Sequence, residues 1–334
     1  MFSDKKLLTH LQTQEHLQKR TSYYFTEINQ IYAIYGATLK EELKKTLLNK
    51  LDQPSKLAIL LVDLQNDFVL PGFALYVPDG ENTLISNMAL LDAVTELVIS
   101  FPELCNRIEL ITSQDAHVYK RNGMSPDAQT LKESYGEEHI RRILQIEYNE
   151  LQNLSPENGQ YGLHCLCGTI GAAIAQPIGI RLTHLQKKIA IYRFAKINFS
   201  APEAGIQLQS NIDLSDSKFL TEINPVYASP ALSFLKFFQN KDYKEILITG
   251  ICGNICVQQA AEGLAKAGEK VCVVDPCVHY LIIPGMSSYH EIKASVQQSY
   301  DAKGIMTLEH HSFPSNYQWN KESQWLTHEE HTLA

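Results

Sequence analysis

The chain has 334 residues, of which 44% are hydrophobic and 20% are charged, and its formal net charge is −8. This balance is that of a globular protein, which excludes a wholly disordered chain, and the length allows one large or two medium domains. An acidic chain lacks the basic surface of a nucleic-acid binder. Seven cysteines in a long chain argue against a disulfide scaffold and for reduced thiols.

The N-terminal residues are charged throughout and lack the apolar core of a signal peptide. No stretch of the sequence approaches the roughly 18 consecutive apolar residues of a membrane-spanning helix. We therefore expect a cytoplasmic protein with neither a membrane nor a nucleic acid as partner.

Residues 1 to about 52 are predicted to be helical, because apolar residues recur at helical spacing over Leu7–Leu17 and again over Ile31–Leu39. Gly36 is expected to interrupt the helix. Asp52, Gln53, Pro54 and Ser55 read as a linker. Residues 1–55 are therefore interpreted as a helical extension outside the main fold.

Apolar strands and helices then alternate along the chain. Strands are expected at 57–63, 107–117, 188–196, 243–256 and 270–278, and helices at 81–100, 257–268 and 292–304. The alternation predicts a three-layer α/β/α fold with a central, mostly parallel sheet. The main domain is expected to span 56–310, with an insertion at about 118–160, and a polar tail to follow at 311–334.

Several chemically active residues lie where the predicted strands end. Asp63 follows the first strand, Asp115 and His117 the second, and Lys196 ends the third. A glycine- and cysteine-rich turn, GICGNIC, ends the fourth. Because ligands bind beyond the carboxyl ends of strands in open α/β sheets, these residues are expected to converge on one edge.

Cys256 opens a predicted helix, where the positive end of the helix dipole lowers the pKa of a thiol. The alternative is an inert buried cysteine. Asp63 is interpreted as a general base in a poorly solvated pocket, or else as a structural cap. Lys196 can stabilise a thiolate, or it is an ordinary solvated lysine. Asp67 is interpreted as structural.

Asp115 and His117 are alternate residues at a strand end, so they share a face and can reach one cation. His164, in the segment YGLHCLCG, is the candidate third ligand. One carboxylate and two imidazoles leave coordination positions open, as a catalytic metal site requires. This donor set suits zinc, iron or manganese. A lone pair such as Asp115 and His117 is a weak signal, and the alternative is that it binds no metal.

Together these motifs resemble the nicotinamidase branch of the isochorismatase-like cysteine hydrolases, over about residues 56–308. The segment LLVDLQNDFVLPGF resembles the opening strand of that family, KINFSAP its lysine motif and GICGNICV its nucleophile turn. The resemblance implies that Asp63, Lys196 and Cys256 are the catalytic residues, and it implies the isochorismatase-like hydrolase fold.

The resemblance also implies an oxyanion hole made by the backbone N–H groups of Cys252 and Cys256, with a cis peptide between residues 251 and 252. Phe68 and Tyr161 would line the substrate pocket.

The metal ligands implied by the resemblance are Asp115, His117 and His164. The metal would be a divalent ion, zinc first with iron and manganese as alternatives, and it would orient the pyridine nitrogen of the substrate.

The activity implied by the resemblance is hydrolysis of nicotinamide to nicotinic acid and ammonia through a cysteine thioester. The partner is thus a small-molecule amide, and a homo-oligomer is a further expectation. The sequence departs from the family pattern at Ala116, Asn254 and Gly263. Two alternatives stay open: another family amidase, acting on a carbamoyl, ureido or different aromatic amide, and a non-catalytic binding protein.

Overall fold

The computed structural model describes residues 4–52, 54–116, 164–165, 170–196, 201–204, 206–208, 228–282 and 288–309. The expected insertion at 118–160 and the expected tail at 311–334 lie outside these residues. The division of the chain into an extension, a main domain and a tail stays a prediction.

An eight-stranded sheet lies at the centre of the described part of the chain, in the order β5-β4-β3-β2-β1-β6-β7-β8. The strands are β1 (Lys56–Val62), β2 (Ile108–Asp115), β3 (Ala190–Lys196), β4 (Ile206–Leu208), β5 (Ala228–Ser233), β6 (Tyr243–Ile251), β7 (Val271–His279) and β8 (Met306–Leu308). The six neighbouring strands β3, β2, β1, β6, β7 and β8 pair in parallel. Strand β4 pairs antiparallel with β3 on one side and with β5 on the other. The prediction of a mostly parallel sheet is confirmed. Strands β4, β5 and β8 were not predicted, because such short segments carry little periodicity.

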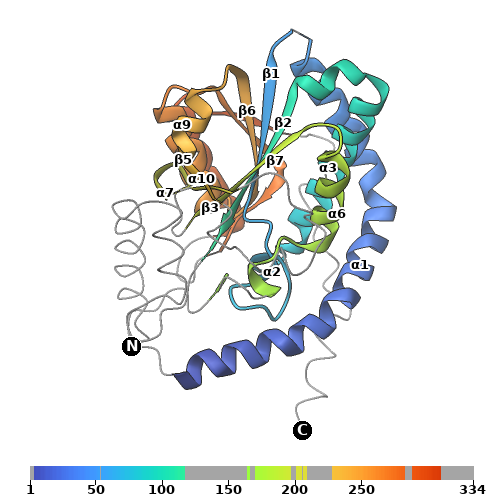
Figure 1. Ribbon diagram of the computed structural model, residues 1–334, viewed down its shortest axis with the longest axis vertical. Helices are drawn as coiled ribbons and strands as arrows, with labels where there is room; N and C mark the ends of the chain where they lie inside the picture. Colours follow the sequence, from blue (N-terminus) through green and yellow to red (C-terminus); the bar gives the residue numbers. More distant parts are fainter. Residues whose placement is uncertain are drawn as a thin grey trace.

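Helices cover both faces of the sheet (Figure 1). The helices on one side are α1 (Asp4–Lys50), α3 (Glu81–Ser100) and α6 (Gln176–Leu185), and those on the other are α7 (Ala201–Ala204), α9 (Phe234–Gln239), α10 (Cys256–Lys266) and α11 (Tyr289–Ala302). The short helices α2 (Asn66–Val69), η1 (Pro102–Asn106) and η2 (Ile170–Ala172) lie in connections. The predicted three-layer fold, with its N-terminal helical extension, is confirmed.

Strand β1 is buried on both faces, which explains its uninterrupted apolar sequence. Successive side chains of a strand point to opposite faces. Those facing the core beneath α3 are Leu57, Ile59 and Leu61, and those facing the core beneath α10 are Ala58, Leu60 and Val62.

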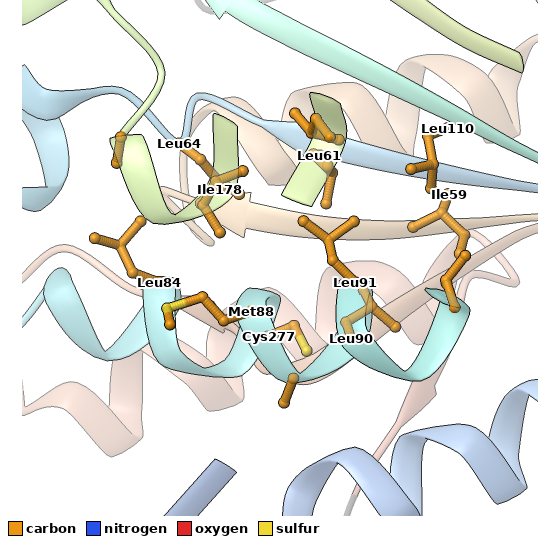
Figure 2. Close-up of a cluster of buried hydrophobic side chains, with 14 of the residues drawn as sticks. Ile59, Leu61, Leu64, Leu84, Met88, Leu90, Leu91, Leu110, Ile178 and Cys277 are labelled. Carbon is orange, nitrogen blue, oxygen red and sulfur yellow. The ribbon is translucent and has the colours of Figure 1, made fainter. Parts of the chain in front are cut away.

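Helix α3 packs directly on this sheet. Figure 2 shows Leu91 of α3 facing Leu61 of β1, with Met88 of α3 and Ile178 of α6 in the same cluster. By length and composition α3 is apolar enough to cross a membrane, but 72% of the relevant window is buried inside the protein. Its apolar surface is therefore accounted for by the sheet on one side and α1 on the other.

Helix α1 runs without a break through Gly36, so the predicted interruption there is wrong. A Cβ atom on Gly36 would lie 2.3 Å from the ring of Tyr32, so the missing side chain makes room for that ring. The Tyr32 hydroxyl donates to Asp92, and the Arg181 guanidinium lies 4.9 Å from the centre of the Tyr32 ring. Gly36 thus serves the packing of α1 on the main fold. The apolar residues that α1 and its C-terminal end bury in the core are Tyr24, Phe25, Ile28, Leu39, Leu43, Leu47 and Leu51.

The order of the parallel strands reverses between β1 and β6. The chain fills the sheet outward from β1 through β2 to β3, and then from β6 through β7 to β8. Such a reversal opens a crevice beyond the carboxyl ends of the two central strands. Asp63 follows β1, and the turn 252–256 follows β6, so both flank this crevice.

Gly250 lets β6 approach β1 at the same place. Its φ is +119°, and a Cβ atom there would lie 2.0 Å from the carbonyl oxygen of Val62. Only glycine tolerates both the conformation and the contact.

We expect Gly250→Ala to lower the free energy of unfolding by about 3 kcal/mol or more, since it adds a backbone clash to conformational strain. The matched control is Gly268→Ala, where φ is +93° but no atom lies within 4 Å of the added Cβ. That variant should lose only about 1–2 kcal/mol. Urea unfolding measures both, and equal losses would contradict the close approach at Gly250.

Candidate functional site

Three of the predicted residues meet at the switch between β1 and β6. The Lys196 Nζ atom lies 2.8 Å from Asp63 Oδ2 and 3.6 Å from Cys256 Sγ. Lys196 and Asp63 are each 1% exposed, and Cys256 is 6% exposed. The end of β3, the end of β1 and the start of α10 thus bring an ammonium, a carboxylate and a thiol together in a site shielded from water.

A second carboxylate contacts the same ammonium. Asp115, at the end of β2, places Oδ1 at 3.4 Å from Lys196 Nζ. Burial by itself lowers the pKa of Lys196, but the carboxylates of Asp115 and Asp63 raise it well above its ordinary value. Lys196 therefore stays positively charged at all physiological pH values.

Asp63 is a base of intermediate strength. Burial raises its pKa to about 6, the Lys196 charge opposes this rise, and the nearby Asp115 adds to it. At neutral pH the carboxylate is mainly ionised, yet it is basic enough to take a proton in a reaction. Its backbone has φ of 52°, an uncommon conformation for a residue other than glycine, which is typical of functional sites.

The Cys256 thiol is neutral at rest. The sequence predicts a lowered thiol pKa at the start of a helix, but burial raises the pKa well above its ordinary value, and this outweighs the lowering by Lys196. That prediction is therefore wrong. The ammonium remains within reach of the sulfur, so it can stabilise a thiolate that forms during a reaction.

The turn between β6 and α10 presents backbone N–H groups beside the thiol. The peptide between Ile251 and Cys252 is cis, as the resemblance implies. The Cys252 carbonyl accepts hydrogen bonds from Ile255 and Val257, whereas the N–H groups of Cys252 and Cys256 donate to no acceptor among the described residues. Two donors at a helix N-terminus can bind a negatively charged oxygen.

Asp115 and His164 form the part of the expected metal site that lies within the described residues. Asp115 Oδ2 and His164 Nε2 are 3.1 Å apart, and both side chains are buried. Two ligands of one tetrahedral zinc, with bonds of about 2.0–2.1 Å, lie roughly 3.3 Å apart. The pair therefore fits a shared cation. His117 lies outside the described residues, within which no cluster of three such side chains is found.

Phe68 lies beside this pair. Its ring is 6% exposed and meets the His164 ring edge to face, with the ring centres 5.8 Å apart. Tyr161 lies outside the described residues.

Gln65 is a residue for which the sequence predicts no role. Its side-chain amide donates to the carbonyls of Asp115 (2.7 Å) and Ala172 (2.8 Å), and its oxygen accepts from the Asp115 N–H (2.7 Å). Gln65 therefore fixes the backbone on both sides of the Asp115 side chain. The polar run Gln65–Asp67 between two apolar stretches is a sequence signal, but it does not reveal partners 50 and 107 positions away.

Two of the departures from the family pattern, at Asn254 and Gly263, have structural roles. Asn254 donates to the Leu281 carbonyl (3.0 Å) and accepts from the Leu281 N–H (2.9 Å), which an acidic side chain cannot do at both atoms. A Cβ atom on Gly263 would lie 2.5 Å from Pro202, so the glycine allows α7 to pack closely on α10. Both replacements therefore suit this chain's own packing.

The fold is similar to solved structures of three enzymes or enzyme relatives. The nicotinamidase/pyrazinamidase of Bacillus subtilis is 14% identical, with 76% of this chain and 100% of that chain covered and a TM-score of 0.47. The pyrazinamidase of Pyrococcus horikoshii, in complex with zinc, is 19% identical, with 76% and 99% covered and a TM-score of 0.44. An isochorismatase family protein of Desulfovibrio vulgaris is 16% identical, with 76% and 93% covered and a TM-score of 0.43. No protein-family model matches the sequence, and no curated protein matches it.

We expect Lys196→Met to lower the free energy of unfolding by about 3–5 kcal/mol, because it leaves two buried carboxylates without their cation. Adding Asp63→Asn in the same chain should restore part of this loss, since one of the uncompensated charges is then removed. Urea unfolding of the single and double variants measures the difference. A double variant less stable than Lys196→Met would contradict the ion pair.

Proposed function

We propose that the protein is an amidohydrolase that converts nicotinamide to nicotinic acid and ammonia through a thioester on Cys256. The observation that carries the proposal is the contact of one buried ammonium, that of Lys196, with both the Asp63 carboxylate and the Cys256 sulfur. A structural ion pair needs no thiol beside it. A thiol, a base and a fixed positive charge in one water-poor site are the components of nucleophilic acyl transfer.

In the first step Asp63 takes the proton of Cys256 as the sulfur attacks the carboxamide carbon. The C–S bond forms, and the π electrons of the carbonyl move to its oxygen. Because the resting thiol is neutral, its proton has to pass to Asp63 for the sulfur to attack as a thiolate. Lys196 stabilises the negative charge that develops on sulfur.

The N–H groups of Cys252 and Cys256 would hold the oxyanion, and each such donor contributes roughly 3 kcal/mol in comparable sites. When the tetrahedral intermediate collapses, the C–N bond breaks, and protonated Asp63 transfers its proton to the departing nitrogen. Ammonia leaves, and a thioester remains on Cys256.

Hydrolysis of the thioester reverses these roles. Asp63, again a carboxylate, takes a proton from a water molecule that attacks the thioester carbon. The C–S bond breaks, nicotinic acid leaves, and the sulfur of Cys256 recovers its proton.

A divalent cation, zinc first, would be held by Asp115 and His164 together with His117. When bound, it supplies a Lewis acid that takes up the pyridine nitrogen and so orients the ring. Phe68, which packs on His164, and Tyr161 would form apolar walls beside that ring. An aromatic amide with a ring nitrogen therefore suits the site better than a carbamoyl or ureido compound.

Ammonia release from nicotinamide tests the proposal, after metal analysis of the purified protein. We expect Cys256→Ala to lose at least about 1,000-fold in kcat/KM while it remains folded, as nucleophile removal does in comparable enzymes. Cys252→Ala is the matched control, because it removes a neighbouring buried thiol and keeps the backbone N–H. That variant should stay within about tenfold of wild type.

Two results would contradict the proposal. Activity of folded Cys256→Ala within tenfold of wild type would exclude the thioester. No ammonia from nicotinamide, with release from a carbamoyl or another aromatic amide in the same assay, would exclude nicotinamide as the substrate and retain the cysteine chemistry.

A further inference from the structure

The buried carboxylate of Asp67 has no part in the mechanism above. Its side chain is fully buried, in the short helix α2 that follows β1. A buried carboxylate is costly unless it is hydrogen-bonded, so its partners indicate why this position is acidic.

One partner is next to a candidate metal ligand. Asp67 Oδ2 accepts a hydrogen bond of 2.6 Å from the backbone N–H of Cys165, the residue after His164. Cys165 has φ of 44°, in the left-handed region that residues other than glycine rarely adopt. The charged hydrogen bond therefore holds the chain in a conformation that it would otherwise avoid.

Further contacts fix the position of the Asp67 carboxylate. Its Oδ1 atom accepts from the Ala74 N–H at 3.3 Å. A Cβ atom on Gly171 would lie 2.2 Å from Oδ1 and 2.3 Å from Oδ2, so the glycine is what lets the carboxylate reach its place.

The hydrogen bond to Asp67 holds the peptide that joins His164 to Cys165, next to the Cα atom that carries the imidazole. With the chain turned in this way, His164 Nε2 lies 3.1 Å from Asp115 Oδ2. Asp115 is itself fixed through its backbone by Gln65, two residues before Asp67. The segment after β1 thus supports both candidate ligands. The amide of Gln65 holds Asp115, and the carboxylate of Asp67 holds the chain beside His164.

We infer that Asp67 is a positioning residue that holds His164 in place to bind a divalent cation together with Asp115. The inference rests on the proposed function only for the presence of the cation. Replacing a residue that holds a metal ligand in place without contacting the metal typically lowers metal affinity 10- to 100-fold.

Zinc affinity of the full chain, measured by competition with a chromogenic chelator, tests the inference. Asp67→Asn keeps the size of the side chain and removes its charge. Gly171→Ala keeps Asp67 and pushes its carboxylate away from the Cys165 N–H. We expect each variant to bind Zn²⁺ 10- to 100-fold more weakly than wild type.

A second readout separates positioning from general stability. In the metal-free protein, the rate at which iodoacetamide alkylates Cys256, followed by peptide mass spectrometry, should stay within twofold of wild type in both variants. The matched control is Asn87→Asp, which disturbs a buried polar group bonded to Thr83, Thr249 and Cys277 in the core beneath α3. It should leave zinc affinity within twofold of wild type.

Unchanged zinc affinity in folded Asp67→Asn and Gly171→Ala would overturn the inference. So would parallel losses of zinc affinity and of normal alkylation in those variants and in Asn87→Asp, since these would report general destabilisation. Wild-type protein that binds no Zn²⁺ would also overturn it. The proposed hydrolysis would then be judged separately, by ammonia release without added metal.

Discussion

The site depends on one buried positive charge. Lys196 lies between the carboxylates of Asp63 and Asp115 and beside the sulfur of Cys256, with almost no exposure to water. An isolated buried ammonium would lose its proton, and isolated buried carboxylates would gain one. Lys196 keeps its charge because the two carboxylates are present, so electrostatic attraction as well as hydrogen bonds holds the ends of β1, β2 and β3 together.

The fold supplies this arrangement through the reversal of strand order between β1 and β6. Figure 1 shows the helices on the two faces that bury these strands. Gly250 lets β6 lie against the Val62 carbonyl, immediately before Asp63, so Asp63 and the turn that leads to Cys256 lie side by side. Burial then has two chemical consequences. It raises the pKa of Asp63 into a useful range, and it keeps Cys256 protonated until a substrate is present.

Much of this could be predicted from the sequence, because the signals were local. An apolar run ending in Asp63 and a glycine turn before Cys256 indicate strand ends, and strand ends of a parallel sheet meet at one edge. What could not be predicted depends on distant contacts. Gln65 bonds to a backbone 50 residues away. Gly36 lies within a continuous helix, where its missing side chain makes room for the Tyr32 ring. The pKa of Cys256 is raised by burial, which outweighs the effect of its place at the helix N-terminus.

The central claim is that Cys256 becomes acylated, while Lys196 stabilises the negative charge on sulfur and Asp63 accepts and returns the proton. Rapid acid quenching during turnover of nicotinamide, followed by mass spectrometry of the peptides, tests it most directly. The account predicts one nicotinoyl group, carried by Cys256 and absent before substrate is added. Ammonia release with no such group on Cys256 at any quench time, or with the group on another side chain, would contradict it.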